Sequence, residues 1–364
     1  MKKVVYLGWL GFGNLGDEAC KDVFIKEFTN ITSKEGKNPI FKPVIPSSFG
    51  KKELMALEPN LIVLGGGSVI MPPYTDLLIL AEKQHIPTAI WGSGMDWLSE
   101  NELSTIRRNL PTKSLHHYRP HAQSIRTACN GSPLIGVRGP HTYRILKTIG
   151  CNMDHIQVVG DPGLLIATQT SRGDLLLPDT LDNSLPVIGV NWGTSFNRVF
   201  GSNEESTSNQ LASALQKLSV HCKIVIYPVW SRDLPAIKEL AAKIHNPSRV
   251  SIISTVPSLP SLVTLLKKCT LTINFKLHAN IFSSAVGTPF ISLGYRSKCY
   301  DFAASLDCEE LVIGFNHPNL KNQIITKAQQ ILAQPSLYTK KIIVNGDKLS
   351  QKLKASLVKI ASQI

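Results

Sequence analysis

The sequence is short of negative charge. Its 364 residues include 26 aspartates and glutamates against 39 lysines and arginines, which gives a formal net charge of +13. This imbalance favours anionic partners such as phosphorylated substrates, polyanions or anionic membrane surfaces. The basic residues are dispersed and form neither a long Lys/Arg run nor a basic patch with interleaved aromatics. We therefore do not expect nucleic-acid binding.

Long apolar runs and paired cysteine motifs are also missing. No stretch reaches about 18 uninterrupted apolar residues, so the sequence predicts no transmembrane helix. The seven cysteines are odd in number and lack Cys-x-x-Cys spacing, which argues against a disulfide framework or a zinc site. No pair of histidines or carboxylates has metal-ligand spacing. We expect a cytoplasmic protein without a metal, with peripheral contact at the inner face of an anionic membrane left open.

Strand-like apolar runs alternate with helical periodicity along most of the chain. Strands are expected at Val4–Gly8, Pro43–Ile45, Leu61–Leu64, Thr88–Trp91, Leu134–Val137, Ile156–Val159, Pro186–Asn191, Lys223–Pro228, Arg249–Ile253, Leu271–Phe275 and Phe290–Leu293. Such alternation predicts βαβ units and parallel sheets. The closing stretch from Leu320 to Ile364 has the pattern of two helices.

A chain of this length is expected to form two domains. Thr170–Leu185, rich in Asp, Ser, Thr and Pro, is the best linker candidate. We predict an α/β fold of two Rossmann-like domains whose parallel sheets face a cleft. The predicted ranges are 1–170 for the N-terminal domain, 186–340 for the C-terminal domain and 341–364 for a C-terminal helix.

Basic side chains follow two neighbouring strands of the second half. Leu271–Phe275 runs directly into Lys276 and His278, and the next strand is followed by a loop containing Arg296 and Lys298. Ligands of open α/β sheets bind outside the carboxyl ends of the strands. Cations there suit phosphate or carboxylate. The segment predicts an anion site, although His278 taken alone would more often be a structural histidine.

The first strand is followed by a glycine-rich turn, Gly11–Gly16, which matches the G-x-G-x-x-G pattern. A dinucleotide site also needs a carboxylate closing the second strand, and none is present, so we reject that interpretation. Asn14, Asp17 and Glu18 place polar groups that suit an acceptor hydroxyl or a general base. The alternative is a tight turn with Asp17 stabilising a helix N-terminus.

Three further strand ends carry candidate binding groups. Gly66 and Gly67 lie in a triple glycine whose backbone amides suit an anion, or which is simply a close-packed loop. Arg138 offers a bidentate fork for carboxylate or phosphate, or else a structural salt bridge. Tyr227–Asp233 supplies aromatic and charged groups, among them Trp230, for contact with a sugar ring.

Taken together, these segments resemble the polysaccharide pyruvyl transferase family. The resemblance spans about residues 4 to 306 and rests on six motifs in order: Gly11–Glu18, Leu64–Ser68, Val137–Pro140, Val159–Pro162, Lys276–Ala279, and Gly287–Pro289 with Tyr295–Lys298. It implies a fold like that of GT-B glycosyltransferases. It also implies transfer of a pyruvyl group from phosphoenolpyruvate to sugar hydroxyls of a polysaccharide or its lipid-linked precursor. The product is a ketal on a cell-wall or exopolysaccharide sugar, and phosphate is released.

The resemblance gives the candidate residues roles, with phosphoenolpyruvate as the donor substrate and no cofactor. His278 would hold the phosphate and supply a proton, and Asp17 would accept the proton of the acceptor hydroxyl. The donor-binding residues would be Arg138, Lys276, Lys298, Gly66 and Gly67. The acceptor-binding residues would be Asn14, Glu18 and Trp230.

The chain departs from the family pattern at two positions. Lys276 stands where the family typically has arginine, which removes a bidentate fork. Gly139 follows Arg138 where the family usually has an Arg-Asp pair. Two alternatives therefore stay open: a GT-B glycosyltransferase using a nucleotide sugar, and a non-catalytic relative that binds a phosphorylated metabolite. Against the first, the stretch Ala279–Val286 has no carboxylate to hold a ribose.

Overall fold

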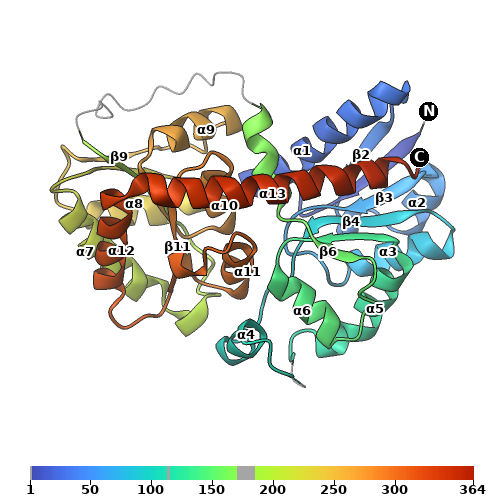
Figure 1. The fold of residues 1–364 in the computed structure, drawn as a ribbon, viewed down its shortest axis with the longest axis horizontal. Coiled ribbons are helices and arrows are strands. Elements are labelled where there is room, and N and C mark those ends of the chain that lie inside the picture. The colour runs from blue at the N-terminus through green and yellow to red at the C-terminus, as the bar shows by residue number, and fades with distance from the viewer. Residues whose placement is uncertain (1, 113–114, 170–184) are drawn as a thin grey trace. The chain divides into compact units, whose positions relative to one another are not determined.

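The computed structural model describes residues 2–112, 115–169 and 185–364 (Figure 1). The predicted linker therefore lies outside the described residues except for Leu185. The chain divides into two compact units. The first comprises Met1–Phe12, Asp17–Gly163 and Lys348–Ile364, and the second comprises Gly13–Gly16 and Leu164–Asp347.

The first unit is built on a six-stranded parallel sheet in the order β2-β1-β3-β4-β5-β6. Its strands are β1 (Lys3–Leu7), β2 (Ile40–Val44), β3 (Leu61–Leu64), β4 (Thr88–Ser93), β5 (Leu134–Val137) and β6 (Ile156–Val158). Its helices are α1 (Leu15–Thr32), α2 (Lys51–Leu57), α3 (Tyr74–Lys83), α4 (Glu100–Arg107), α5 (Ala122–Gly131) and α6 (Pro140–Thr148). The residues of β3 and β4 are all buried, as expected for parallel strands covered on both faces.

The second unit has its own six-stranded parallel sheet, in the order β12-β11-β10-β7-β8-β9. The strands are β7 (Val187–Asn191), β8 (Lys223–Tyr227), β9 (Val250–Ile252), β10 (Leu271–Asn274), β11 (Phe290–Gly294) and β12 (Val312–Gly314). The helices are α7 (Glu204–Leu218), α8 (Leu234–Ala242), α9 (Leu259–Lys268), α10 (Leu277–Ala285), α11 (Ser297–Ser305) and α12 (Leu320–Ala333). The long helix α13 (Pro335–Ala361) gives its first part to this unit and its last part to the first unit.

Strand order locates where each sheet is suited to bind a ligand. In the second unit the chain starts in the middle at β7, builds outward through β8 and β9, then returns to place β10 on the other side of β7. In the first unit the same reversal falls between β1 and β3. Loops leave in opposite directions at such a reversal, so a crevice opens at the carboxyl ends of the two strands. We therefore expect ligands to bind at the carboxyl ends of β7 and β10 in the second unit and of β1 and β3 in the first, here called the β7/β10 and β1/β3 edges.

The predicted fold class is confirmed by the two parallel sheets with their helices. The eleven predicted strands and the two closing helices are present, but α5, α11 and β12 were not predicted. Lys298 lies in the first turn of α11, so its assignment to a loop was wrong. The helix was missed because Arg296, a residue that does not commonly cap helices, occupies its N-cap.

The two units differ from the predicted domain ranges in several places. The first unit ends its main segment at Gly163, so Leu164–Gln169 belongs to the second unit and not to the N-terminal domain. Gly13–Gly16 belongs to the second unit, where the Leu15 amide donates to the Val229 carbonyl at 3.0 Å. Lys348–Ile364 belongs to the first unit, where the indole N–H of Trp91 donates to the Leu353 carbonyl at 3.1 Å. Among the described helices, none combines the length and the apolarity needed to cross a bilayer.

Candidate active site

The β7/β10 edge of the second unit is tied together by Asn191, the last residue of β7. Its side-chain oxygen accepts a hydrogen bond from the amide of Lys276 at 3.0 Å, just beyond β10. Its side-chain nitrogen donates to the carbonyl of Tyr227, at the end of β8, at 3.0 Å. One buried amide therefore fixes the ends of three neighbouring strands, which is the rigid support that a binding site needs.

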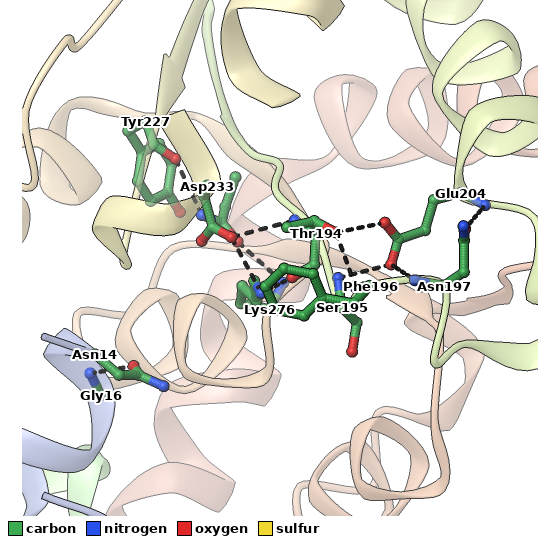
Figure 2. Close-up of polar contacts among 11 residues, drawn as sticks. Asn14, Gly16, Thr194, Ser195, Phe196, Asn197, Glu204, Tyr227, Asp233 and Lys276 are labelled. Atoms are coloured by element: carbon green, nitrogen blue, oxygen red, sulfur yellow. Dashed lines mark hydrogen bonds and ion pairs between the residues drawn. The ribbon is translucent and has the colours of Figure 1, made fainter. Parts of the chain in front are cut away.

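The ammonium of Lys276 is held from several sides at this edge (Figure 2). It lies 3.1 Å from Oδ1 of Asp233 and donates a hydrogen bond to the carbonyl of Thr194. It also lies 5.0 Å from the centre of the Trp230 ring, within range of a cation–π contact. Only 14% of the lysine side chain is exposed. Lys276 is thus a partly buried cation whose charge is largely balanced by one carboxylate.

Asp233 is fully buried beside this lysine. Its Oδ1 accepts a second hydrogen bond, from the amide of Thr194 at 3.2 Å. Its Oδ2 is buried and has no hydrogen-bond partner among the described residues. Burial raises the pKa of Asp233 to about 6, although the charge of Lys276 acts in the opposite direction. A Cβ on Gly193 would lie 2.2 Å from the Asp233 carboxyl carbon, so only glycine fits there.

His278 lies at the same edge, in the first turn of α10. Its ring is buried and stacks on Phe282, with ring centres 6.0 Å apart. A Cβ added to Gly16 would lie 2.0 Å from Cγ of His278, so the imidazole fits only because residue 16 is glycine. The Gly16 amide donates to Oδ1 of Asn14 at 3.0 Å, and Asn14 forms a β-bridge with Trp230. The glycine-rich segment thus packs on His278 and Trp230.

Two helices begin side by side at this edge. Strands β10 and β11 pair in parallel, and each is followed by a nine-residue helix, α10 or α11. The N-cap residues are Lys276 and Arg296, and neither side chain caps its helix. Arg296 and Lys298 both place their charge 5.2 Å from the ring centre of Tyr295. Helix N-termini and basic side chains both favour an anion, so positive potential collects here.

In the first unit, Arg138 lies at the end of β5 and is fully buried. Its guanidinium donates to the Gly67 carbonyl at 3.4 Å, the Ser68 hydroxyl at 3.1 Å and the Met95 carbonyl at 3.3 Å. A Cβ on Gly94 would approach Nη2 to 2.2 Å. Arg138 therefore fastens the glycine-rich ends of β3 and β4 to each other.

Two carboxylates, Asp17 and Asp161, are buried near the β1/β3 edge of the first unit. The Cys20 thiol donates to Oδ1 of Asp161 at 3.6 Å, and Oδ1 of Asp17 lies 3.0 Å from where a Cβ on Gly67 would be. Burial raises the pKa of Cys20 well above its ordinary value, and the charges of Asp161 and Asp17 raise it further. The same two charges raise the pKa of the buried Tyr6, after burial itself. This edge is electronegative, in contrast to the cationic edge of the second unit.

Comparison with known proteins identifies the family. The family model for polysaccharide pyruvyl transferase matches residues 14–297. The chain belongs to this family. The match includes Asp17, Asp161, Lys276 and His278, and family membership makes the protein a transferase that acts in polysaccharide biosynthesis.

Solved structures with the same fold include nucleotide-sugar enzymes. S. aureus MnaA in complex with UDP has a TM-score of 0.64 at 12% identity, covering 94% of this chain and 91% of that one. UDP-GlcNAc 2-epimerase from Neisseria meningitidis, bound to UDP-GlcNAc, has a TM-score of 0.57 at 13% identity, covering 97% and 99%. Glycyrrhiza uralensis UGT73P12 has a TM-score of 0.62 at 12% identity, covering 100% and 96%. These likenesses establish a GT-B fold for this pyruvyl transferase family member. A search of curated protein sequences gives no match.

The structure distributes the predicted site residues of this family member over the two units. The second unit contains Asn14, in the segment Gly13–Gly16, and Trp230, Lys276, His278 and Lys298, which follow the strands β8, β10 and β11 in the chain. The first unit contains Asp17, Glu18, Gly66, Gly67 and Arg138. Their binding and catalytic roles stay predictions.

Several of these residues already have partners within the protein. Glu18 accepts from the Gly11 amide at 2.7 Å and pairs with Lys21 at 2.8 Å. Partial burial raises the pKa of Glu18, but these hydrogen bonds outweigh it and lower the pKa overall. The Gly66 amide donates to the hydroxyl of Tyr6 at 3.2 Å. An acceptor or donor at these groups would therefore compete with existing hydrogen bonds.

Two residues of the cationic edge were not singled out from the sequence. Asp233 was noted only within a charged and aromatic segment, and Glu204 was not noted at all. The carboxylate of Glu204 accepts hydrogen bonds from the Thr194 hydroxyl at 2.7 Å and the Ser195 amide at 2.6 Å (Figure 2). Glu204 is the first residue of α7, and an acidic residue there is ordinary for a helix start, so it gave no separate signal.

Proposed function

We propose that this pyruvyl transferase family member transfers the enolpyruvyl carbon of phosphoenolpyruvate to sugar hydroxyls of a polysaccharide or its lipid-linked precursor. The observation that carries the proposal is the cationic edge of the second unit. There α10 and α11 begin directly after adjacent parallel strands, and each has a basic N-cap residue. Phosphoenolpyruvate carries a phosphate and a carboxylate, so two neighbouring helix N-termini suit its two anionic groups.

The reaction needs one acceptor oxygen to attack C2 of the enol while C3 takes up a proton. The bond from C2 to the phosphate oxygen then breaks, and a second hydroxyl of the same sugar attacks C2 to close the ketal. Of the two hydroxyl protons, one ends on C3 and the other leaves with inorganic phosphate. Atoms and charge balance without a redox partner.

Residue roles follow from the electrostatics of each unit. Lys298, His278 and the start of α10 would hold the phosphate, and His278 would also provide the proton for C3. Lys276 is already paired with Asp233, so it would contribute less net charge than the arginine usual in the family. Asp17, in the electronegative first unit, would accept the proton from the attacking hydroxyl. The surplus of positive charge, +13 overall, suits acceptors presented at the inner face of an anionic membrane during cell-wall or exopolysaccharide synthesis.

Calorimetric titration with phosphoenolpyruvate tests the donor assignment, with UDP-GlcNAc as the comparator. We expect saturable binding of phosphoenolpyruvate that weakens about tenfold in Lys298→Ala, because one phosphate contact is lost. Lys268→Ala, an exposed lysine at the end of α9 in the same unit, is the matched control and should bind normally. Binding of UDP-GlcNAc without phosphoenolpyruvate would instead support a nucleotide-sugar glycosyltransferase, the function of several proteins with this fold.

The role of Asp17 is tested separately by turnover. Asp17→Asn should lower the rate of acceptor-dependent phosphate release about 10²-fold or more, the usual worth of general base catalysis. Its affinity for phosphoenolpyruvate should stay near that of the wild type. A fully active Asp17→Asn variant would rule this role out.

A further inference from the structure

The loop that follows β7 holds an aromatic side chain in the solvent. Phe196 and Asn197 both have a backbone φ of 55°, in the left-handed region that residues other than glycine rarely adopt. Such a conformation is strained and persists only where surrounding contacts enforce it. The side chain of Phe196 is 57% exposed. The loop therefore bears strain while leaving a large apolar ring unburied.

Glu204 enforces this loop conformation. Its carboxylate accepts hydrogen bonds from the Thr194 hydroxyl at 2.7 Å, the Ser195 amide at 2.6 Å and the Asn197 amide at 3.2 Å. In return, the Glu204 amide donates to the side-chain oxygen of Asn197 at 3.1 Å. Figure 2 shows this network on one side of the loop, opposite the contacts of Thr194 with Asp233. The outward position of Phe196 is thus fixed by the hydrogen bonds that Glu204 makes with the residues on either side of it, Ser195 and Asn197.

The exposed ring is part of a corner with Trp230. The two rings meet edge to face, with centres 6.2 Å apart and planes at 90°. Arg232, an exposed residue, lies 5.3 Å from the centre of the Trp230 ring, and Lys276 lies 5.0 Å from it. The corner therefore combines an apolar surface with guanidinium N–H donors, next to the cationic edge.

This combination matches the chemistry of a pyranose. One face of a pyranose ring presents C–H groups that pack on an aromatic ring, and its edge presents hydroxyls that accept from arginine. Phosphoenolpyruvate has no apolar face that would occupy an exposed phenyl ring. Because Trp230 contacts Lys276, a sugar on Phe196 would lie beside the edge that holds the donor.

We propose that Phe196 forms a stacking platform for the pyranose ring of the acceptor, with Trp230 as the perpendicular wall of the corner and Arg232 donating to the sugar hydroxyls. This inference deepens the proposed function, and it rests on that function for identifying the bound sugar as the acceptor substrate. Glu204 is then a positioning residue: it touches no substrate but holds Phe196 outward.

Saturation-transfer difference NMR tests the platform without requiring turnover. The probes are methyl β-D-galactopyranoside, methyl β-D-glucopyranoside and methyl α-D-mannopyranoside, each added alone to the full-length protein. We expect saturation transfer to the ring protons of at least one probe, and about tenfold weaker binding in Phe196→Ala. Val220→Ala removes a side chain that is 61% exposed in the same unit and should behave as the wild type. Phe196→Trp should retain binding because it keeps a flat aromatic face.

Each outcome decides the proposal. Equal transfer to the probes from wild type and from Phe196→Ala, or no transfer from the wild type to any probe, overturns it. Displacement of a bound sugar by an equimolar amount of UDP also overturns it and assigns the aromatic corner to a nucleobase. Phe196-dependent sugar binding without phosphate release from phosphoenolpyruvate supports the platform while refuting the proposed reaction. Failure of the two proposals can therefore be told apart.

Discussion

Replacing Asp233 by asparagine should change how the stability of the protein depends on pH. In the native protein the pKa of Asp233 rises from its ordinary 3.8 to about 6, because the group is fully buried. The native state therefore binds this proton more tightly than the unfolded state does. The protonated group adds stability that is fully present below pH 3.8 and is lost as the pH rises through about 6.

The size of the effect follows from the two pKa values. Between pH 7.5 and pH 4.5, the shift from 3.8 to about 6 amounts to about 2 kcal/mol of added stability at the acidic end. Asparagine has no proton to gain in this range. The stability of the wild type relative to Asp233→Asn should thus be about 2 kcal/mol greater at pH 4.5 than at pH 7.5, whatever the absolute stability of the variant.

Urea denaturation of both proteins across pH 4.5–7.5, followed by circular dichroism, measures this difference. Asp22→Asn, which removes a largely exposed carboxylate, is the control for the general effect of losing one negative charge. A flat difference for Asp233→Asn would refute the account, since it would mean that Asp233 is ionised with an ordinary pKa. A difference that grows toward pH 7.5 would mean that Lys276 lowers the pKa by more than burial raises it.

Three other variants test close contacts. Gly94→Ala brings a methyl group against Arg138 and should cost about 1–3 kcal/mol, measured as a lower urea midpoint; an unchanged midpoint would contradict the packing. Gly16→Ala should displace the ring of His278 and lower turnover about 10²-fold, whereas normal turnover would exclude a catalytic imidazole at this position. Trp91→Phe removes an indole hydrogen bond to α13 and should cost about 1 kcal/mol, with faster hydrogen exchange in the last part of that helix.

The strands were predictable from the sequence because parallel strands buried on both faces are largely apolar, and Leu61–Leu64 is apolar throughout. The helix Ala122–Gly131 was not predicted. It has only three buried side chains, follows a Pro-containing turn and has no side-chain cap, so its start signal is weak. The local pattern of apolar residues therefore predicts buried strands better than it predicts helices with few buried side chains.

The site was predictable only in part. The basic residues after β10 and β11 were identified because each follows its strand directly in the sequence. The contact between Gly16 and His278, and the pairing of Asp233 with Lys276, join residues far apart in the chain. A single sequence carries no signal for such pairs. The exposure of Phe196 depends on backbone strain, which residue type alone does not reveal.

The path of the chain between the units has a consequence for folding while the protein itself is being synthesised. The first unit includes Lys348–Ile364, which supplies the carbonyl acceptors for Trp91 and for the ammonium of Lys37. A ribosome makes the second unit before it reaches this segment. At about 5–20 residues per second, synthesis of the second unit takes of the order of ten seconds or more. During that interval the first unit lacks the carbonyl acceptors that this segment supplies to Trp91 and Lys37. The unit whose synthesis begins first is the one that is completed last.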